Sequence, residues 1–173
     1  RDQRLPREPL GNAFSAGLRY VAMSPNLMQV ILRGFWFGLS AIALLALLPV
    51  VVREILQGSA FVYGVMLGCF GMGAVMGALL NARLRAGFAN EMIARGGFTG
   101  FAFSCGGLAF STQPILSGIA LMLAGACWVL SLSMFNVTIQ LSTPRWVVGR
   151  VIALYQTGTF GGMAAGSLIW GTI

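Results

Sequence analysis

The chain has 173 residues, of which 57% are hydrophobic and only 9% are charged, and its net charge is +7. With a mean hydropathy of +0.83, a water-soluble domain of this size would expose too much apolar surface to stay in solution. The sequence contains no histidine, so the commonest general base and metal ligand is missing. Composition therefore excludes a soluble domain and indicates a membrane protein.

Residues 1–23 precede the long apolar stretches. The part from Arg1 to Asn12 is charged and contains two prolines, which is typical of a connecting loop. The part from 13 to 23 then places three apolar residues on one helical face, namely Phe14, Leu18 and Val21. We therefore expect residues 1–23 to form a cytoplasmic loop that ends in a short helix lying in the membrane interface.

Five apolar stretches follow, and each is long enough to cross a bilayer as a helix. About 20 apolar residues suffice, because a helix rises ~1.5 Å per residue through a hydrocarbon core of ~30 Å. Ser24 followed by Pro25 predicts the start of the first helix. The expected spans are 34–52, 60–80, 92–110, 115–141 and 151–173. The predicted fold class is an all-α, polytopic membrane protein with five transmembrane helices.

The arginines predict how these spans are oriented. Ten of the eleven basic residues fall in the N-terminal part, in the loop 81–95 and in the loop 142–150, and only Arg53 falls in the other connections. This alternation is the positive-inside pattern, which reflects membrane insertion rather than a nucleic-acid partner. We therefore expect the residue 1 end to be cytoplasmic and the residue 173 end to lie outside, in the lipid bilayer of an inner (cytoplasmic) membrane.

Polar side chains within the spans gather on the fourth span. Ser133, Asn136 and Gln140 recur at three and four residues, which places them on one side of a helix. An amide in hydrocarbon must face another helix or a wet cavity, so an interhelical hydrogen bond and a substrate contact both remain open. The predicted substrate cavity comprises these three residues with Trp36, Ser40 and Trp128, although core packing explains the aromatic residues equally well.

The second and fifth spans are rich in glycine at helical spacing. Glycines at such spacing remove side chains from one helix face, so two backbones can approach closely in lipid. Two interpretations remain open, namely fixed packing within one bundle and a smooth seam along which two bundles tilt. The predicted seam comprises Gly64, Gly68, Gly158, Gly162 and Gly166.

No catalytic or metal site can be assembled from this sequence. The four acidic residues, Asp2, Glu8, Glu54 and Glu91, all lie near the ends of spans or outside them, and the three cysteines are isolated. A hydrolase needs a base, a nucleophile and an orienting group. We therefore expect no enzyme, no metal and no cofactor. If a proton gradient drives transport, the coupling residue lies outside this segment.

Three segments carry a resemblance to a known family: GALLNARLR (Gly77–Arg85), TPRWVVGRVIALYQ (Thr143–Gln156) and FGGMAAGSLIWG (Phe160–Gly171). They resemble the major facilitator superfamily, and more narrowly the transmembrane secretion effectors, the exporter group similar to the enterobactin exporter. The resemblance implies that residues 24–173 are helices seven to eleven of twelve, with the N-terminal half of the same transporter as partner. A start at Arg rather than Met, and an end on an apolar residue, agree with a piece of a longer protein.

The resemblance also implies two cytoplasmic gate loops. The family's Gly-x-x-x-Asp-Arg/Lys-x-Gly-Arg/Lys-Arg/Lys motif is matched closely only at Gly77, since Asn81 stands where the acidic residue belongs. Arg83 and Arg85 keep basic character nearby, and Gly149–Arg150 matches the family's Gly-Arg pair at the equivalent loop. The implied function is secondary active export of a small drug- or siderophore-like molecule by alternating access. The alternative is a non-transporting membrane subunit that uses its Gly-rich helices to bind partners.

Overall fold

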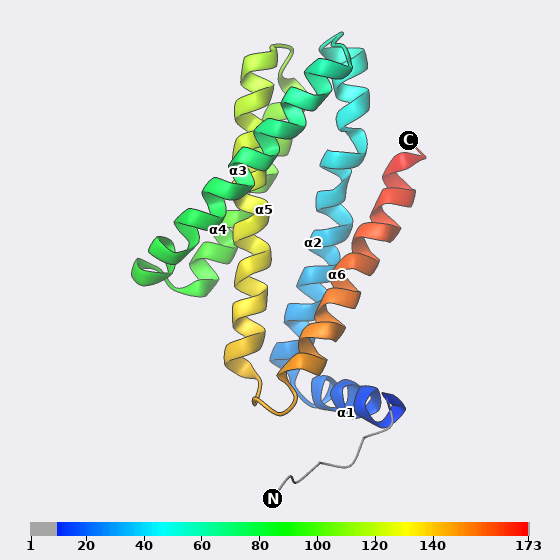
Figure 1. Ribbon diagram of the computed structural model, residues 1–173, viewed down its shortest axis with the longest axis vertical. Helices are drawn as coiled ribbons and strands as arrows, with labels where there is room; N and C mark the ends of the chain where they lie inside the picture. Colours follow the sequence, from blue (N-terminus) through cyan, green and yellow to red (C-terminus); the bar gives the residue numbers. More distant parts are fainter. Residues whose placement is uncertain (1–9, 173) are drawn as a thin grey trace, which may run out of the picture.

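The computed structural model describes residues 10–172, all of them in helices or short connections. The predicted charged loop up to residue 9 lies outside the described residues. In chain order the elements are α1 (Leu10–Ala22), α2 (Pro25–Val50), the π-helical turn η1 (Val51–Ile55), α3 (Ala60–Gly87), α4 (Asn90–Phe110), α5 (Pro114–Ser142) and α6 (Val148–Gly171) (Figure 1). No strand occurs in the described range, so the all-α prediction is confirmed.

The ends of α2 follow from its prolines. The helix begins at Pro25, as the sequence predicts, although the Ser24 hydroxyl makes no capping hydrogen bond. Near its other end Pro49 has no N–H to donate to the carbonyl four residues earlier. Beyond it the helix widens into η1, where the Leu56 N–H donates to the carbonyl five residues earlier at 3.1 Å. Gln57, with a φ of 47°, then turns the chain toward α3.

Three of the five predicted spans have the length and apolar character of a membrane helix: Pro25–Ile55, Ala60–Gly87 and Pro114–Ser142. The helices α4 and α6, of 21 and 24 residues, run beside α5 and α2 (Figure 1). They are less apolar because charged residues and many glycines interrupt them. The expectation that α4 and α6 also cross the membrane stays a prediction.

Two predicted loops are shorter than the sequence analysis expects. Because α3 continues to Gly87 and α4 begins at Asn90, most of the predicted loop 81–95 is helical. The predicted loop 142–150 shortens in the same way, since α6 begins at Val148. Each predicted span ends where the charged residues begin. Arginine and alanine are good helix formers, so a helix can extend past the hydrocarbon with its charged turns in water.

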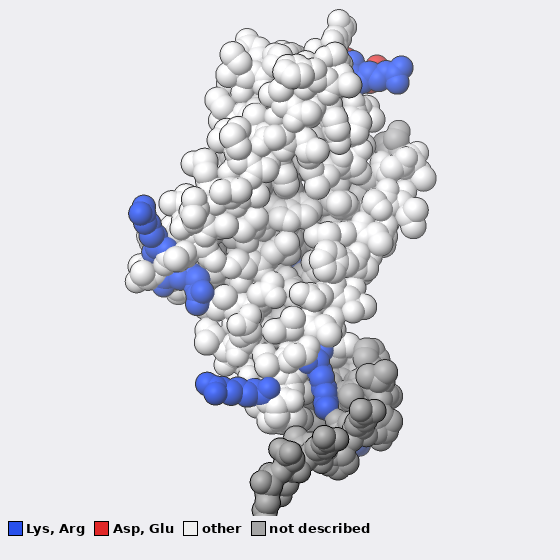
Figure 2. All heavy atoms as spheres, viewed as in Figure 1, with Lys and Arg blue, Asp and Glu red and all other residues white. Residues whose placement is uncertain are grey.

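A wide part of the molecular surface carries no charged side chain. Figure 2 shows basic side chains at the left edge about halfway up, in the lower part and at the upper edge of this face, and uncharged atoms over the rest of it. Large apolar side chains are exposed on several helices, and Phe110 is 91% exposed. Others are Phe61, Phe103, Ile115 and Leu168. A surface of this kind needs lipid or further protein against it.

The helices α6 and α2 pack backbone to backbone. Cβ atoms at Gly162 and Gly166 would collide with the carbonyl oxygens of Phe35 and Leu39, which lie one turn apart on α2. A Cβ at Gly38 would likewise strike the α6 backbone. Lipid gives no hydrophobic drive for helix association, so this close approach is what holds the pair together.

The helices α3 and α5 repeat this contact. Cβ atoms at Gly73 and Gly77 on α3 would collide with the carbonyl oxygens of Met122 and Ala126 on α5. Gly125 lies three residues after Met122, just as Gly38 lies three residues after Phe35. A Cβ at Gly125 would strike the α3 backbone. The chain therefore contains an internal repeat in which α2 corresponds to α5 and α6 to α3, with the two copies running in opposite directions (Figure 1).

Candidate substrate and gating residues

The structure does not bring the six predicted cavity residues into one site. Trp36 and Ser40 lie on the face of α2 that is turned toward α4. Trp128, on α5, belongs to a cluster of aromatic rings that includes Phe37 and Phe101. Ser133, Asn136 and Gln140 lie on the part of α5 nearest α1. The three groups have different surroundings and different chemistry.

A groove of about 640 Å³ separates α2 from α4. The α2 side is formed by Gln29, Leu32, Arg33, Trp36, Phe37, Ser40 and Ala41, and the α4 side by Phe98, Phe101, Ala102 and Cys105. Trp36 is 62% exposed there. The volume suits a drug-sized ligand. Among the described residues, α5 and α6 contribute no lining residue to this groove, so a cavity that Trp36 and Ser40 share with residues of α5 stays a prediction.

Trp128 belongs to an aromatic cluster that joins α2, α4 and α5. Phe37 stands at its centre, with its ring centroid 5.0 Å from that of Phe98, 5.7 Å from Phe101, 5.8 Å from Trp128 and 6.3 Å from Phe135. Three of these pairs are edge to face and the pair with Trp128 is tilted, which are favourable arrangements for aromatic rings. Core packing, one of the two interpretations of the aromatic residues, describes Trp128.

The sequence left two interpretations of the polar residues on α5, namely an interhelical hydrogen bond and a substrate contact, and the three residues differ in this respect. Ser133 Oγ accepts a hydrogen bond from Asn81 Nδ2 at 2.6 Å, which links α5 to α3. Asn136 Nδ2 donates to the Leu132 carbonyl of its own helix at 2.9 Å, and Gln140 is exposed. Among the described residues no hydrogen bond joins Asn136 to another helix. Asn136 thus has no hydrogen-bond partner on another helix among the described residues, whereas Ser133 has a structural partner on α3.

The predicted gate residues lie on helices rather than in loops. Gly77 is buried in the α3–α5 contact, so its role in this structure is helix packing. Asn81 lies one turn further along α3 and positions Ser133. The remaining residues lie at helix ends: Arg83 and Arg85 are exposed on α3, and Gly149 and Arg150 lie in the first turn of α6.

The helix α1 lies across the end of the bundle and packs on the start of α6 (Figure 1). A Cβ at Gly17 would lie 3.1 Å from Cβ of Arg150. The ring of Tyr20 meets that of Trp146 edge on, with centroids 6.0 Å apart. Arg150 therefore lies beside α1. The placement of α1 in the membrane interface stays a prediction.

The predicted seam glycines fall into two groups. Gly162 and Gly166 are buried against α2, and a Cβ at Gly158 would lie 3.3 Å from the side chain of Ile31 in α2. On α6, this face packs within the bundle, which corrects the expectation of a seam there. Cβ atoms at Gly64 and Gly68 would have nothing within 4 Å, so the seam stays a prediction for α3.

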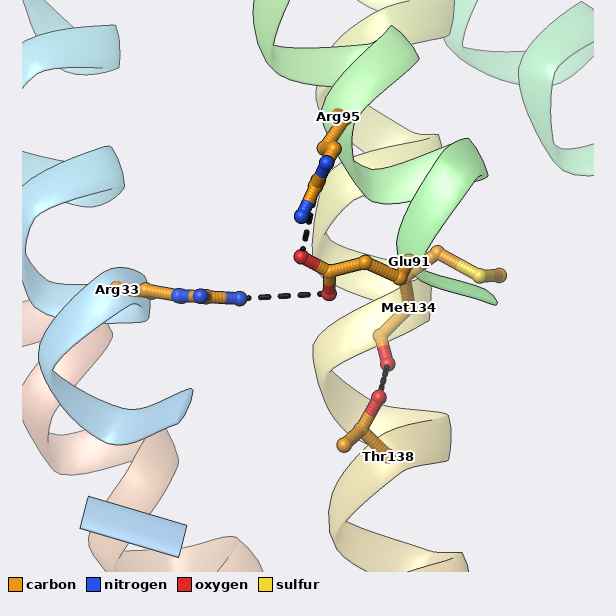
Figure 3. A network of polar contacts seen from close by, with 5 residues as sticks. All are labelled: Arg33, Glu91, Arg95, Met134 and Thr138. Carbon is orange, nitrogen blue, oxygen red and sulfur yellow. Dashed lines mark hydrogen bonds and ion pairs between the residues drawn. The ribbon is translucent and has the colours of Figure 1, made fainter. Parts of the chain in front are cut away.

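A polar network joins α2 to α4 at the end of the groove nearest α1 (Figure 3). Arg33 Nη1 lies 3.4 Å from Glu91 Oε2, and Arg95 Nε lies 3.1 Å from Glu91 Oε1. Figure 3 shows the two guanidinium groups approaching one carboxylate from different sides. All three side chains are half exposed or more. The ion pairs therefore hold the Arg33 side chain at the edge of the groove but add little to the stability of the protein.

We expect Glu91→Gln to lower the free energy of unfolding by less than about 1 kcal/mol, because solvent screens exposed ion pairs. Thermal unfolding of the purified protein in detergent should show a small decrease that disappears near 1 M salt, where the screening length is about 3 Å. Glu54→Gln is the matched control, because among the described residues Glu54 pairs with its neighbour Arg53 alone, at 3.8 Å. A large decrease that persists in high salt would contradict this estimate.

Sequence reasoning missed two of these contacts and had a signal for a third. Nothing in the sequence pairs Arg33 with Glu91 or Asn81 with Ser133, since the partners are more than fifty residues apart. Gly34 and Gly38 of α2 both contact α6, and their separation of four residues is the same spacing that drew attention to the fifth span. Among the described residues, no three His, Cys, Asp or Glu side chains form a group that could hold a metal ion.

Comparison with known proteins gives the family. A family model described as transmembrane secretion effector matches residues 1–173. A search of curated proteins and a search of solved structures each found no match. The matching family is one of transporters of the major facilitator type, which agrees with the apolar helices and points away from an enzyme. The chain therefore belongs to the transmembrane secretion effectors, a family of multi-pass membrane transporters of the major facilitator type.

Proposed function

We propose that this chain forms most of the C-terminal bundle, helices seven to eleven, of a secondary active exporter in the enterobactin-exporter-like group. The internal inverted repeat carries the proposal, because α2 with α6 and α5 with α3 form the same glycine-mediated contact in opposite directions. Such repeats are typical of transporters that work by alternating access. The N-terminal half of the transporter would supply the opposite wall of the substrate pathway.

The proposed substrate is a small drug- or siderophore-like molecule that is moved out of the cell. Asn136 and Gln140 are the proposed polar contacts, since neither amide is bonded to another helix among the described residues. Most of their neighbours on α5 are apolar, so an amphipathic ligand would find both kinds of surface there. Gly64 and Gly68 are proposed to face the N-terminal half.

The proposed orientation places the α1 end in the cytoplasm and the residue 173 end outside the inner membrane. In the structure, Arg53 lies at the end of the bundle far from α1. Arg19 lies on α1, Arg150 packs against α1, and Arg145 lies in the connection between α5 and α6 at the same end of the bundle. This distribution supports the orientation because positive residues accumulate on the cytoplasmic side. The proposed driving force is a proton gradient whose coupling residue lies outside this segment.

The test is Asn136→Leu in the intact transporter. We expect export to fall by up to about tenfold, the loss of one hydrogen bond to a ligand, while the amount of protein in the membrane is unchanged. Leucine suits a half-buried position on an apolar helix, and the hydrogen bond that it removes is internal to α5. Efflux of a fluorescent amphipathic compound from proteoliposomes measures the effect.

Thr138→Val is the matched control for this substitution. Its Oγ1 donates to the Met134 carbonyl at 2.8 Å, the same bond to the preceding turn that Asn136 makes. Export should be normal in Thr138→Val. Unchanged export in Asn136→Leu would remove Asn136 from the substrate site. A wild-type protein that folds and transports nothing would favour the non-transporting membrane subunit.

A further inference from the structure

The helices α3 and α4 are joined by only two residues, Phe88 and Ala89, yet they contact each other little. Each helix packs instead on α5, and both use glycines to do so. A crevice of about 310 Å³ remains between α3 and α4, with α5 behind it. This crevice shares no described lining residue with the groove between α2 and α4, so it is a separate feature of the molecule.

The crevice is apolar and open to the surroundings. Leu84 and Phe88 line it at the end of α3, Met92 and Gly96 line it on α4, and Leu130 lines it on α5. Phe88 is 55% exposed and Met92 is 60% exposed. A Cβ at Gly96 would have nothing within 4 Å, so this glycine leaves a hollow rather than a helix contact. A hydrocarbon chain suits such a lining, because it makes no demand for hydrogen bonds.

Two arginines lie beside this crevice. Arg83 and Arg85 flank the lining residue Leu84 in the sequence, and both are exposed near the end of α3. Within the part of the chain that the structure describes, neither has an ion-pair partner. Figure 2 shows basic side chains at the left edge, where the connection between α3 and α4 lies in Figure 1. Two unpaired positive charges beside an apolar crevice are complementary to an amphipathic anion.

The crevice lies on the side of α3 that packs on α5. Leu84 follows Gly77 by seven residues, about two turns, and Gly77 is buried against α5. Gly68 precedes Gly77 by nine residues, about two and a half turns, so it lies on the opposite side of the helix. If that opposite side meets the N-terminal half, as the proposed function has it, the crevice stays accessible to lipid.

We propose that this crevice binds one acyl chain of an anionic phospholipid, whose phosphate lies on Arg83 and Arg85. Basic residues at the ends of membrane helices attract anionic lipid headgroups, and an arginine can donate two hydrogen bonds to one phosphate. The apolar lining holds the chain while the two guanidinium groups hold the headgroup. The lipid is a structural ligand that fills the space between α3 and α4, and not the transported molecule.

Native mass spectrometry of the intact protein in detergent tests the headgroup contact. The probes are palmitoyl-oleoyl phosphatidylglycerol and palmitoyl-oleoyl phosphatidylcholine, which share their acyl chains and differ in net charge. The variant is Arg83→Gln combined with Arg85→Gln. Its control is Arg19→Gln combined with Arg145→Gln, which removes the same charge from exposed positions elsewhere. The dissociation constant of the first bound lipid is measured for each protein.

We expect the wild-type protein to bind phosphatidylglycerol more tightly than phosphatidylcholine. In the Arg83 and Arg85 double variant, the dissociation constant for phosphatidylglycerol should rise about 25-fold, which is about fivefold for each arginine near a membrane surface. Binding should be nearly unchanged in the control. Equal binding of the two lipids to the wild type, or equal losses in the two double variants, would overturn the proposal.

Gly96→Leu tests the acyl-chain contact with the same two lipids. Leucine fills the hollow, so the dissociation constants of both lipids should rise by about fourfold for each methylene group that is displaced. Gly106→Leu is the matched control on α4, because a Cβ there would also have nothing within 4 Å and Gly106 does not line the crevice. Unchanged binding in Gly96→Leu, or an equal loss in Gly106→Leu, would overturn the proposal.

Size-exclusion chromatography confirms that each variant folds before lipid is added. The arginine variant changes only exposed side chains, so it decides the question by itself if Gly96→Leu does not fold. Lipid binding is measured without transport. A failure of this proposal therefore leaves the proposed export function standing, and a protein that exports nothing can still bind the lipid.

Discussion

Replacing Gly162 by leucine should prevent α6 from packing on α2. Even a Cβ at this position would collide with the carbonyl oxygen of Phe35, and a backbone atom cannot move aside as a flexible side chain can. The two helices would have to separate along the contact that also contains Gly166. We expect the free energy of unfolding to fall by about 3 kcal/mol or more, with loss of most folded protein from the membrane.

Gly161→Leu is the control for this prediction. Gly161 is the neighbouring residue on α6, it is exposed, and a Cβ there would have nothing within 4 Å. Both variants place leucine in the same turn of the same helix, so a difference between them reports the α2–α6 contact alone. Fluorescence-detected size-exclusion chromatography after heating measures both. Equal stability of the two variants would show that α6 does not pack on α2 through this face.

Phe37→Ala should produce the second large effect. The Phe37 side chain is 5% exposed and its ring contacts rings from both α4 and α5, so alanine leaves a cavity where three helices meet. Large-to-small substitutions of a buried phenylalanine cost about 3–5 kcal/mol in soluble cores. The loss of packing applies equally in lipid, and we expect at least about 2 kcal/mol here.

Phe103→Ala is the matched control for the aromatic cluster. Phe103 belongs to α4 but points outward, so alanine there removes an aromatic ring without opening a cavity. Thermal unfolding of the two purified variants in the same detergent compares them. A Phe37→Ala protein as stable as Phe103→Ala would mean that the cluster does not hold α2 against α4 and α5.

The candidate site shows where sequence reasoning reached its limit. The spacing of Ser133, Asn136 and Gln140 placed them together on α5, because residues three and four apart share a helix face. The same rule could not say that Ser133 meets Asn81, or that Trp36 faces α4 rather than α5. Those contacts depend on how each helix is rotated about its axis, and an apolar helix in lipid carries little sequence signal for that rotation.

The sequence by itself determined that the chain is all-helical, where its helices begin and end to within a few residues except at the end of α3, and that its composition requires a membrane. It could do so because the length of an apolar stretch and the positions of Pro25 and the charged residues act locally. Only the tertiary structure decided which face each glycine turns to which neighbour. Gly162 faces α2, whereas Gly64, with equally suitable spacing, faces nothing among the described residues. In lipid, helices pack closely where their backbones can approach each other, and the two helices can be distant in sequence. The role of a glycine therefore depends on which helix lies opposite it.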